Sequence, residues 1–193
     1  MKAKVVYAPQ PDEPPETSAA HEYAQRVPSL VGDSADTSDS SDGATSNANA
    51  IVVERLTLES LDFLTKGNGG DDEQTNAQHI FIISCSADGS ADRIVRKLIR
   101  SLKNGTSSGV TSASQRLKVA IALLGHAQCE NSANQMKDTI FGNGRKFCKA
   151  VKGLLEAVGD ANANDLFSSL EVQVELEGPD AAGGFDEWVR ELA

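Results

Sequence analysis

Two uninterrupted apolar runs limit the folds that are open to this chain. His79 to Ser84 reads His-Ile-Phe-Ile-Ile-Ser, and Leu117 to Leu124 reads Leu-Lys-Val-Ala-Ile-Ala-Leu-Leu. Neither run alternates apolar with polar residues, as a strand with one wet face does, and both have the length of a strand. Strands that are buried on both faces belong to parallel sheets covered by helices on both sides.

Helical patterns separate the strands. Ala91 to Lys103 places apolar residues at helical spacing, and Gly144 to Val158 does the same before Gly159 ends it. Leu170 to Leu176 alternates apolar with acidic residues, which is typical of a half-buried edge strand. The chain alternates five predicted strands (2–8, 51–54, 79–84, 117–124 and 170–176) with five predicted helices (16–30, 58–64, 91–103, 144–158 and 185–192). This alternation predicts a parallel α/β sheet with helices on both faces.

Three loops of such a sheet are the candidates for a functional site. Ligands bind at the carboxyl ends of the strands, where the strand order reverses. The loops at that edge are 8–18 after the first strand, 84–92 after the third and 125–143 after the fourth.

The length of 193 residues predicts a single domain, 1–193. Residues 31–49 are acidic and rich in serine, and they contain no large apolar residue after Val31. They bury too little surface to offset the entropy of ordering, so we expect a disordered insertion there. Residues 67–78 form a second polar segment, which we expect to be a flexible acidic loop.

The formal net charge of -10 limits the partners. An acidic surface repels the phosphates of nucleic acids and of anionic lipids, so neither a nucleic acid nor a membrane is expected as a partner. The alternatives are a protein partner, favoured if it is basic, or no electrostatic partner at all. No apolar run approaches the ~20 residues that span a bilayer.

Cysteine usage indicates a reducing compartment. The three cysteines, Cys85, Cys129 and Cys148, are an odd number and form no CxxC pair, which favours free thiols. The cytoplasm is the expected location, and an organelle matrix stays open.

Two long stretches of the chain resemble the flavodoxin family and, within it, the FMN domain of diflavin reductases. Leu117 to Gly125 stands where that family has a strand similar to Val-Lys-Tyr-Ala-Val-Phe-Gly-Leu-Gly. Phe141 to Gly159 resembles the helix that follows, with Gly144-Arg-Lys146 at its Gly-Lys start. The resemblance covers nearly the whole chain outside the two acidic segments.

Two shorter stretches support the same resemblance. Gly178 to Ala182, followed by Phe185 to Trp188, is similar to the closing helix of diflavin reductases that supply electrons to cytosolic iron–sulfur assembly. Thr17 to Ala24 resembles the Thr-Gly-Thr-Ala-Glu-x-x-Ala stretch that closes the phosphate loop. The resemblance implies a three-layer, doubly wound fold with a five-stranded parallel sheet in the order 2-1-3-4-5, and FMN at the strand ends.

The first loop departs most from the family's pattern. The family holds the FMN phosphate in a Ser-x-Thr-Gly-Thr loop, whereas this chain has Pro9-Gln-Pro-Asp-Glu-Pro-Pro-Glu16. Prolines lack N–H donors, and Asp12, Glu13 and Glu16 place carboxylates near the phosphate position. One carboxylate about 4 Å from a phosphate charge costs on the order of 1–4 kcal/mol at surface-like dielectrics. Ser18 replaces the glycine that lets the backbone come close.

The other two loops lack the aromatic residues that the resemblance implies. Ser84 to Gly89 replaces an aromatic and Gly-x-Gly-Asp run, and Gly125 to Glu130 offers His126 in place of a stacking tyrosine. Losing a stacking aromatic costs ~1–3 kcal/mol, by analogy with bases on aromatic side chains. If FMN binds, weakly or otherwise, the candidate cofactor-binding residues are Gln10, Thr17, Ser18, Ser86, Ala87, Asp88, Gly89, Gly125 and His126.

Other interpretations of these residues are weaker. Cys85 and His126 follow adjacent strands and form a candidate nucleophile and base, or a metal site with Cys129, although small buried cysteines are common. A receiver domain shares the strand order but needs an aspartate at the end of the third strand, where this chain has Ser84-Cys85. We expect Tyr7, Tyr23 and Trp188 in the core. The basic helix 93–103 is most simply a solvated face, and the alternative is that its positive charge complements an acidic partner.

Two functions follow from the sequence. The first is a degenerate flavodoxin-like domain that has lost tight FMN binding and serves as a protein interaction or assembly module. The second is an FMN-binding electron-transfer domain of a diflavin-reductase-like system. The simultaneous change of all three loops favours the first, because function belongs to the site and not to the fold.

Overall fold

Five strands and four α-helices make up the described part of the chain, residues 3–33, 51–61, 78–86, 88–105, 118–125, 141–157, 171–176 and 181–193 of a computed structural model. The strands are β1 (Ala3–Ala8), β2 (Ile51–Arg55), β3 (Gln78–Cys85), β4 (Lys118–Gly125) and β5 (Glu171–Glu175). The helices are α1 (Ala19–Asp33), α3 (Arg93–Gly105), α5 (Gly142–Ala157) and α7 (Ala181–Leu192), and two 3-10 turns are η1 (Pro15–Thr17) and η2 (Leu58–Leu61).

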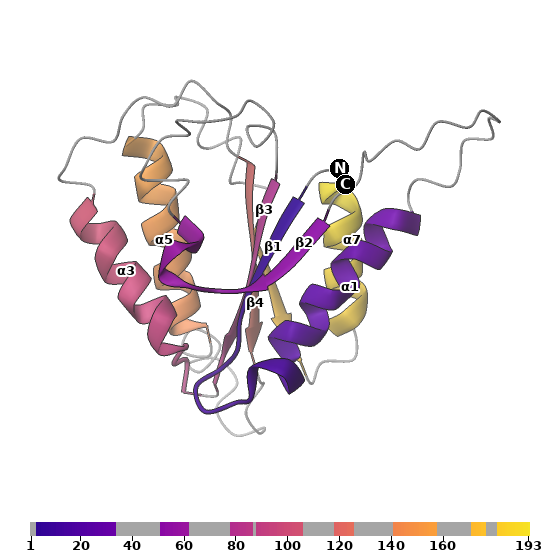
Figure 1. Ribbon diagram of the computed structural model, residues 1–193, viewed down its shortest axis with the longest axis horizontal. Helices are drawn as coiled ribbons and strands as arrows, with labels where there is room; N and C mark the ends of the chain where they lie inside the picture. Colours follow the sequence, from indigo (N-terminus) through magenta and orange to yellow (C-terminus); the bar gives the residue numbers. More distant parts are fainter. Residues whose placement is uncertain are drawn as a thin grey trace.

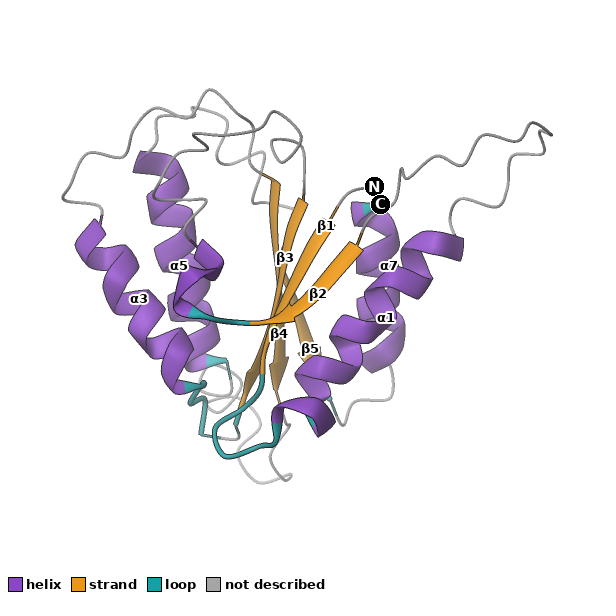
Figure 2. Ribbon diagram, in the orientation of Figure 1, coloured by secondary structure: helices purple, strands orange, loops and turns teal. Residues whose placement is uncertain are grey.

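The sheet is parallel throughout and has the order β2-β1-β3-β4-β5. This is the doubly wound order of flavodoxin-like folds, so the predicted fold class is confirmed. Helices α3 and α5 cover one face of the sheet, and α1 and α7 cover the other (Figures 1 and 2). The chain therefore forms the expected three layers.

The apolar strands divide their side chains between the two faces. In β3, Phe81 and Ile83 belong to the core under α3 and α5, whereas Ile80 and Ile82 belong to the core under α1 and α7. All four are completely buried. Successive side chains of a strand point to opposite faces of the sheet. Because both faces are covered by helices here, residues on both sides of the strand have to be apolar, and the run therefore does not alternate with polar residues.

Aromatic residues close the core between α1 and α7. Tyr23 and Phe185 pack edge to face with ring centroids 4.8 Å apart, and Trp188 lies 5.7 Å from Phe185. Arg26 of α1 donates to both carboxylate oxygens of Asp186 in α7, at 2.8 and 2.6 Å. Tyr7, Tyr23 and Trp188 are all buried, which confirms their predicted place in the core.

Several element boundaries differ from the prediction. Helix α1 continues to Asp33, because Val31 lies one turn after Val27 and is buried with it, so residues 31–33 are not part of a disordered insertion. Gln78, placed in the second loop, begins β3 and is buried. The expected helix 58–64 is a 3-10 turn in its described part, Leu58–Leu61. Residues 34–49 and 67–77 lie outside the described residues.

None of the helices in the described ranges combines the length and the apolar character that crossing a bilayer requires.

Two glycines of α5 allow a matched test of packing. A Cβ on Gly144 would lie 2.7 Å from Cδ2 of Leu123 and 3.2 Å from Sγ of Cys85, whereas a Cβ on Gly153 would meet nothing within 4 Å. We expect Gly153→Ala to stabilise the protein by about 0.4–1 kcal/mol, because alanine narrows the unfolded ensemble. Gly144→Ala should be destabilising by about 1–3 kcal/mol, because it overpacks a filled core. Urea denaturation measures both, and equal effects of the two substitutions would contradict this packing.

Candidate functional site

The candidate site lies at the carboxyl edge of the sheet, where loops 9–18 and 86–92 lie at the same end of the molecule (Figure 2). Of the predicted cofactor-binding residues, the first loop carries Gln10, Thr17 and Ser18, the second carries Ser86, Asp88 and Gly89, and Gly125 ends β4. Ala87 and His126 lie outside the described residues, as does the rest of the third loop up to residue 140.

A tight turn opens the first loop. The N–H of Glu13 donates to the carbonyl of Gln10 at 3.4 Å, and Asp12 has a φ of 67°. Proline at the second position and a positive φ at the third are the features of a type II turn, in which glycine is the preferred third residue. Asp12 therefore has a strained backbone conformation. It lies in the loop that the resemblance assigns to the FMN phosphate.

The hydroxyl groups predicted to hold a phosphate are bonded within the loop. Ser18 is the N-cap of α1: its Oγ accepts from the N–H of His21 at 3.1 Å and donates to the carbonyl of Pro15 at 2.8 Å. Thr17 directs its N–H and its Oγ1 at the carbonyl of Pro14, at 3.3 and 3.5 Å. Thr17 and Ser18 thus stabilise the start of the helix.

His21 is a residue of this site that sequence reasoning missed. Its ring lies 5.0 Å from that of Tyr7, its Nδ1 is 2.8 Å from the carbonyl oxygen of Glu16, and its Nε2 is 3.1 Å from Nε2 of Gln25. The ring anchors the first turn of α1 to the end of β1. The signal in the sequence was weak, because a histidine three residues after a capping serine is no known motif.

Three residues of the first loop, all before the start of α1, carry carboxylates. Asp12 and Glu16 are exposed, and Glu13 is half-buried. One carboxylate oxygen of Glu13 is enclosed and has no hydrogen-bond partner among the described residues. The charge at this end of the loop is therefore negative, as the sequence predicted.

The second loop is closed by its own hydrogen bonds. The N–H of Ser86 donates to the carbonyl of Ser90 at 2.9 Å, and the N–H of Gly89 donates to the carbonyl of Ser86 at 2.7 Å. The Asp88 carboxylate accepts from Oγ of Ser86 at 2.6 Å and from the N–H of Ser90 at 2.9 Å. These bonds lower the pKa of Asp88 to about 2, the Ser86 hydroxyl contributing most.

The same loop is fixed to the start of α5. The N–H of Asn143 donates to the carbonyl of Gly89 at 3.0 Å. Gly89 has a φ of 75°, which a residue with a side chain rarely adopts. The Asp88-Gly89 turn thus holds two elements together through its backbone.

The strand ends of β4 and β5 are also joined at this edge. The N–H of Leu176 donates to the carbonyl of Gly125 at 2.9 Å, and Gly125 pairs with Cys85 on one side and Glu175 on the other. The carbonyl of Gly125 is therefore part of the sheet edge.

Cys85 is a buried structural thiol. Its side chain is completely buried, and burial raises its pKa to about 11, although a backbone hydrogen bond from Gly144 opposes the shift. A thiol with a raised pKa forms little of the nucleophilic thiolate at neutral pH. His126 and Cys129, its proposed partners, lie outside the described residues, and no group of His, Cys, Asp or Glu in the described ranges has the arrangement of a metal site.

The described residues of this edge do not fit the phosphate of FMN. Phosphate sites combine convergent N–H groups, hydroxyls and a helix N-terminus. Here, four of the nine positions from 9 to 17 are prolines, three others are acidic, and the hydroxyls of Thr17 and Ser18 both bond to loop carbonyls. The second loop likewise uses the N–H groups of Ser86, Gly89 and Ser90 internally.

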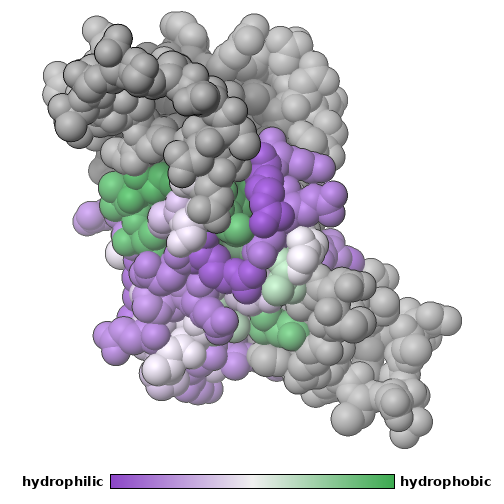
Figure 3. All heavy atoms as spheres, turned by 90° about the vertical axis from the view of Figure 1, so that its right-hand side faces the viewer, coloured by the Kyte–Doolittle hydropathy of each residue, from purple (hydrophilic) through white to green (hydrophobic). Residues whose placement is uncertain are grey.

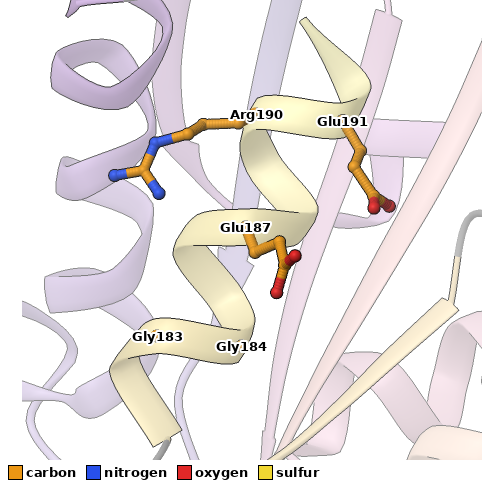
Figure 4. A pocket seen from close by; sticks show the side chains of 5 residues that line it. All are labelled: Gly183, Gly184, Glu187, Arg190 and Glu191. Atoms are coloured by element: carbon orange, nitrogen blue, oxygen red, sulfur yellow. The ribbon is translucent and has the colours of Figure 1, made fainter.

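A surface hollow of about 760 Å³ lies elsewhere, along α7. Its described lining is Gly183, Gly184, Glu187, Arg190 and Glu191. Figure 4 shows that Arg190 points away from the two glutamates, so these side chains do not converge on a common point. We place the candidate site at the carboxyl edge, because parallel sheets bind ligands there and this hollow is an open surface of one helix.

The pKa of Asp88 predicts how the second loop responds to acid. Because its folded pKa of about 2 lies below the ordinary value of 3.8, its contribution to stability is present above about pH 4 and is lost as the pH falls through about 2. We expect Asp88→Asn to weaken the pH dependence of unfolding between those values. An NMR titration of the carboxyl group checks the pKa directly, and an ordinary value would contradict the hydrogen-bonded loop.

The burial of Cys85 and Cys148 predicts their reactivity. In a Cys129→Ser background, both remaining thiols are buried in the native protein, so an alkylating reagent at pH 8 should label them only as fast as the protein unfolds. Mass spectrometry with and without urea measures this rate. Labelling of native Cys85 at the rate of an exposed thiol would show that it is accessible.

Comparison with known proteins adds little to this description. No family model and no curated protein matches the chain. Among solved structures, a cysteine-to-alanine mutant of flavodoxin from Pseudomonas aeruginosa is similar to the chain, with a TM-score of 0.43 and 14% sequence identity over 100% of this chain and 96% of that one. The assignment of a flavodoxin-like fold therefore rests on the strand order of the sheet itself.

Proposed function

We propose that this chain is a flavodoxin-like scaffold that has lost tight FMN binding and works as a protein-interaction module. One observation carries the proposal: in the two described loops at the carboxyl edge, the hydroxyl groups of Thr17, Ser18 and Ser86 and the N–H groups of Ser86, Gly89 and Ser90 are directed at carbonyl and carboxylate oxygens of the loops themselves. A ligand would have to break these bonds in order to gain its own, and such an exchange returns little free energy.

Electrostatics supports the same conclusion. The exposed carboxylates of Asp12 and Glu16 belong to the loop that the resemblance assigns to the FMN phosphate. Each carboxylate near a phosphate opposes binding by on the order of 1–4 kcal/mol, and every 1.4 kcal/mol is about tenfold in affinity. Two carboxylates at about 4 Å from the phosphate would together weaken FMN binding by on the order of 2–8 kcal/mol, which is at least about tenfold in affinity.

The described residues retain the five strands and the helices on both faces of the sheet. Both cores under the sheet are filled, and the Arg26–Asp186 pair ties the first helix to the last. A rigid domain without its ligand is suited to presenting a surface to another protein. The resemblance to the FMN domain of diflavin reductases is then one of scaffold.

The alternative function is FMN-dependent electron transfer. The Asp88-Gly89 turn supports it, because a left-handed glycine follows β3 where the resemblance places a glycine-rich flavin loop. An electron carrier of this kind needs FMN affinity high enough to keep the cofactor bound through purification.

A titration with FMN and riboflavin tests the proposal. We expect no saturable heat and no flavin quenching up to about 500 µM of either compound, a limit that corresponds to a binding free energy weaker than about 4.5 kcal/mol. Saturable binding of FMN at micromolar concentration, or a yellow protein on purification, would establish the electron-carrier alternative instead.

A charge-neutralised variant tests the stated cause. Asp12→Asn with Glu16→Gln should bring FMN binding into the measurable range, with saturation below about 500 µM, whereas riboflavin, which has no phosphate, should still show no binding. The matched control is Glu59→Gln with Glu187→Gln, which removes two exposed carboxylates away from the loop. An equal effect of both variants would mean that net charge acts and not the loop.

A further inference from the structure

Helices α3 and α5 are rich in Lys and Arg, although the protein as a whole is acidic. Five Lys and Arg residues lie on α3 and four on α5, half of the 18 in the chain. The two helices together contain one acid, Glu156, near the end of α5. The chain has 28 acids, so their near absence from this face is a specific feature.

The cations form two outward stripes. On α3, Arg93, Arg96, Lys97 and Arg100 are exposed, while Val95, Leu98 and Ile99 face the core. This stripe is about 10 Å long at 1.5 Å per residue. On α5, Lys146 and Lys149 are exposed opposite the buried Phe147 and Val151.

The two stripes belong to one surface. Helices α3 and α5 pack side by side on the same face of the sheet (Figures 1 and 2). On the opposite face, the described atoms are mostly hydrophilic with some hydrophobic patches (Figure 3). Its helices carry both signs: α1 and α7 contain Glu22, Glu187 and Glu191 as well as Arg26 and Arg190. Among the described helices, only α3 and α5 carry exposed charges of almost one sign, and the nearby η2 turn, which contacts α3, adds the acid Glu59.

This arrangement works against the stability of its own helices. Arg93 and Lys97, and Arg96 and Arg100, are like charges four residues apart, which repel each other on a helix surface. Arg93 begins α3 and Arg145 lies in the first turn of α5, where the helix dipole disfavours cations. A stable fold does not need these charges, so a role in binding is the better explanation.

We propose that the α3–α5 surface binds an acidic helix of a partner protein. Carboxylates on such a helix recur every three or four residues, about 5–6 Å apart, which matches the spacing of the cations along α3. Clusters of Arg and Lys recognise acidic motifs by charge-assisted hydrogen bonds. The inference rests on the proposed function, because it names the partner chemistry of the interaction module.

A protein partner fits this surface better than a nucleic acid does. Single-stranded nucleic acids stack their bases on exposed aromatic rings, whereas Phe141 and Phe147, the aromatic residues at α5, are buried. A duplex extends well beyond a patch of this size and would meet the negative charge of the rest of the chain. An acidic helix covers the patch alone, within the ~8 Å range of electrostatic attraction at physiological salt.

The test uses a labelled, alanine-rich peptide of about 20 residues, long enough to form a helix, with glutamates three and four residues apart. Binding is followed by fluorescence anisotropy at low and high salt. We expect saturable binding that weakens at least tenfold at high salt, and no binding of the same peptide with glutamine in place of glutamate.

Two matched double variants localise the binding. Arg100→Gln with Lys149→Gln removes one cation from each stripe and should weaken binding at least tenfold, whereas Arg55→Gln with Arg190→Gln removes two exposed cations elsewhere and should change it less than twofold. All four side chains are exposed, so both variants should keep the wild-type thermal midpoint. Equal losses in both variants would overturn the proposal, as would failure of the acidic peptide to bind.

Two further outcomes would assign the surface to another occupant and so overturn the proposal. A single-stranded oligonucleotide that binds more tightly than the peptide, with the same dependence on Arg100 and Lys149, would make it a nucleic-acid surface. Peptide binding that requires neutralising Asp71, Asp72 and Glu73 would make it a surface for the chain's own acidic segment. The FMN titration is independent, so failure of the peptide test is distinguishable from failure of the proposed function.

Discussion

The burial of β3 and β4 on both faces is the constraint on which the rest of the structure depends. Ile80 to Ile83 and Ala120 to Leu124 are fully buried, and they supply side chains to both cores. Two central strands of this kind need a layer of helices on each side, because either uncovered face would expose a continuous apolar surface. The parallel direction of all the strands then brings the loops after β1, β3 and β4 to one edge, whatever residues those loops contain. The fold thus creates a place for a ligand, and the loop residues decide whether a ligand can use it.

The part of the fold that depends on apolar periodicity was predictable from the sequence. The unbroken apolar run in β3 can be buried as a strand covered on both faces, and the spacing of Val95, Leu98 and Ile99 can be buried as one side of a helix. The structure shows both elements with these residues buried. Helix ends were less predictable, since they depend on tertiary contacts: Val31 extends α1 because the sheet offers it a buried place. The interior of the candidate site was the least predictable. The Ser86–Asp88–Ser90 bonds and the contact of His21 with Tyr7 depend on loop geometry that no periodicity encodes.

The charged surfaces were also only partly predictable from the sequence. The cationic stripe of α3 is visible in the sequence, and by itself it resembles an ordinary solvated face. The fold places α5, with Lys146 and Lys149, next to α3, although the two helices are about 50 residues apart in the chain. The two groups of cations therefore form one surface that the sequence alone does not show. A net charge of -10 describes the field at a distance, whereas a partner that comes within a Debye length responds to the local sign. An acidic protein can therefore repel polyanions in general and still bind one acidic partner through a confined basic surface.

The contact between α1 and α7 has a consequence for synthesis on the ribosome. Phe185, Trp188 and Val189 complete a core whose other wall, with Tyr23 and Val27, is made at the opposite end of the described chain. Until residues 181–192 have emerged, a nascent chain that already holds all five strands has only α1 on this face, so the part of the sheet that α7 contacts, at β5, and the ring of Tyr23 stay uncovered. The α3–α5 layer has no such delay, since its helices precede β5. Folding during translation should therefore proceed one face at a time, and the unfinished α1 face is the surface that a nascent-chain chaperone would recognise.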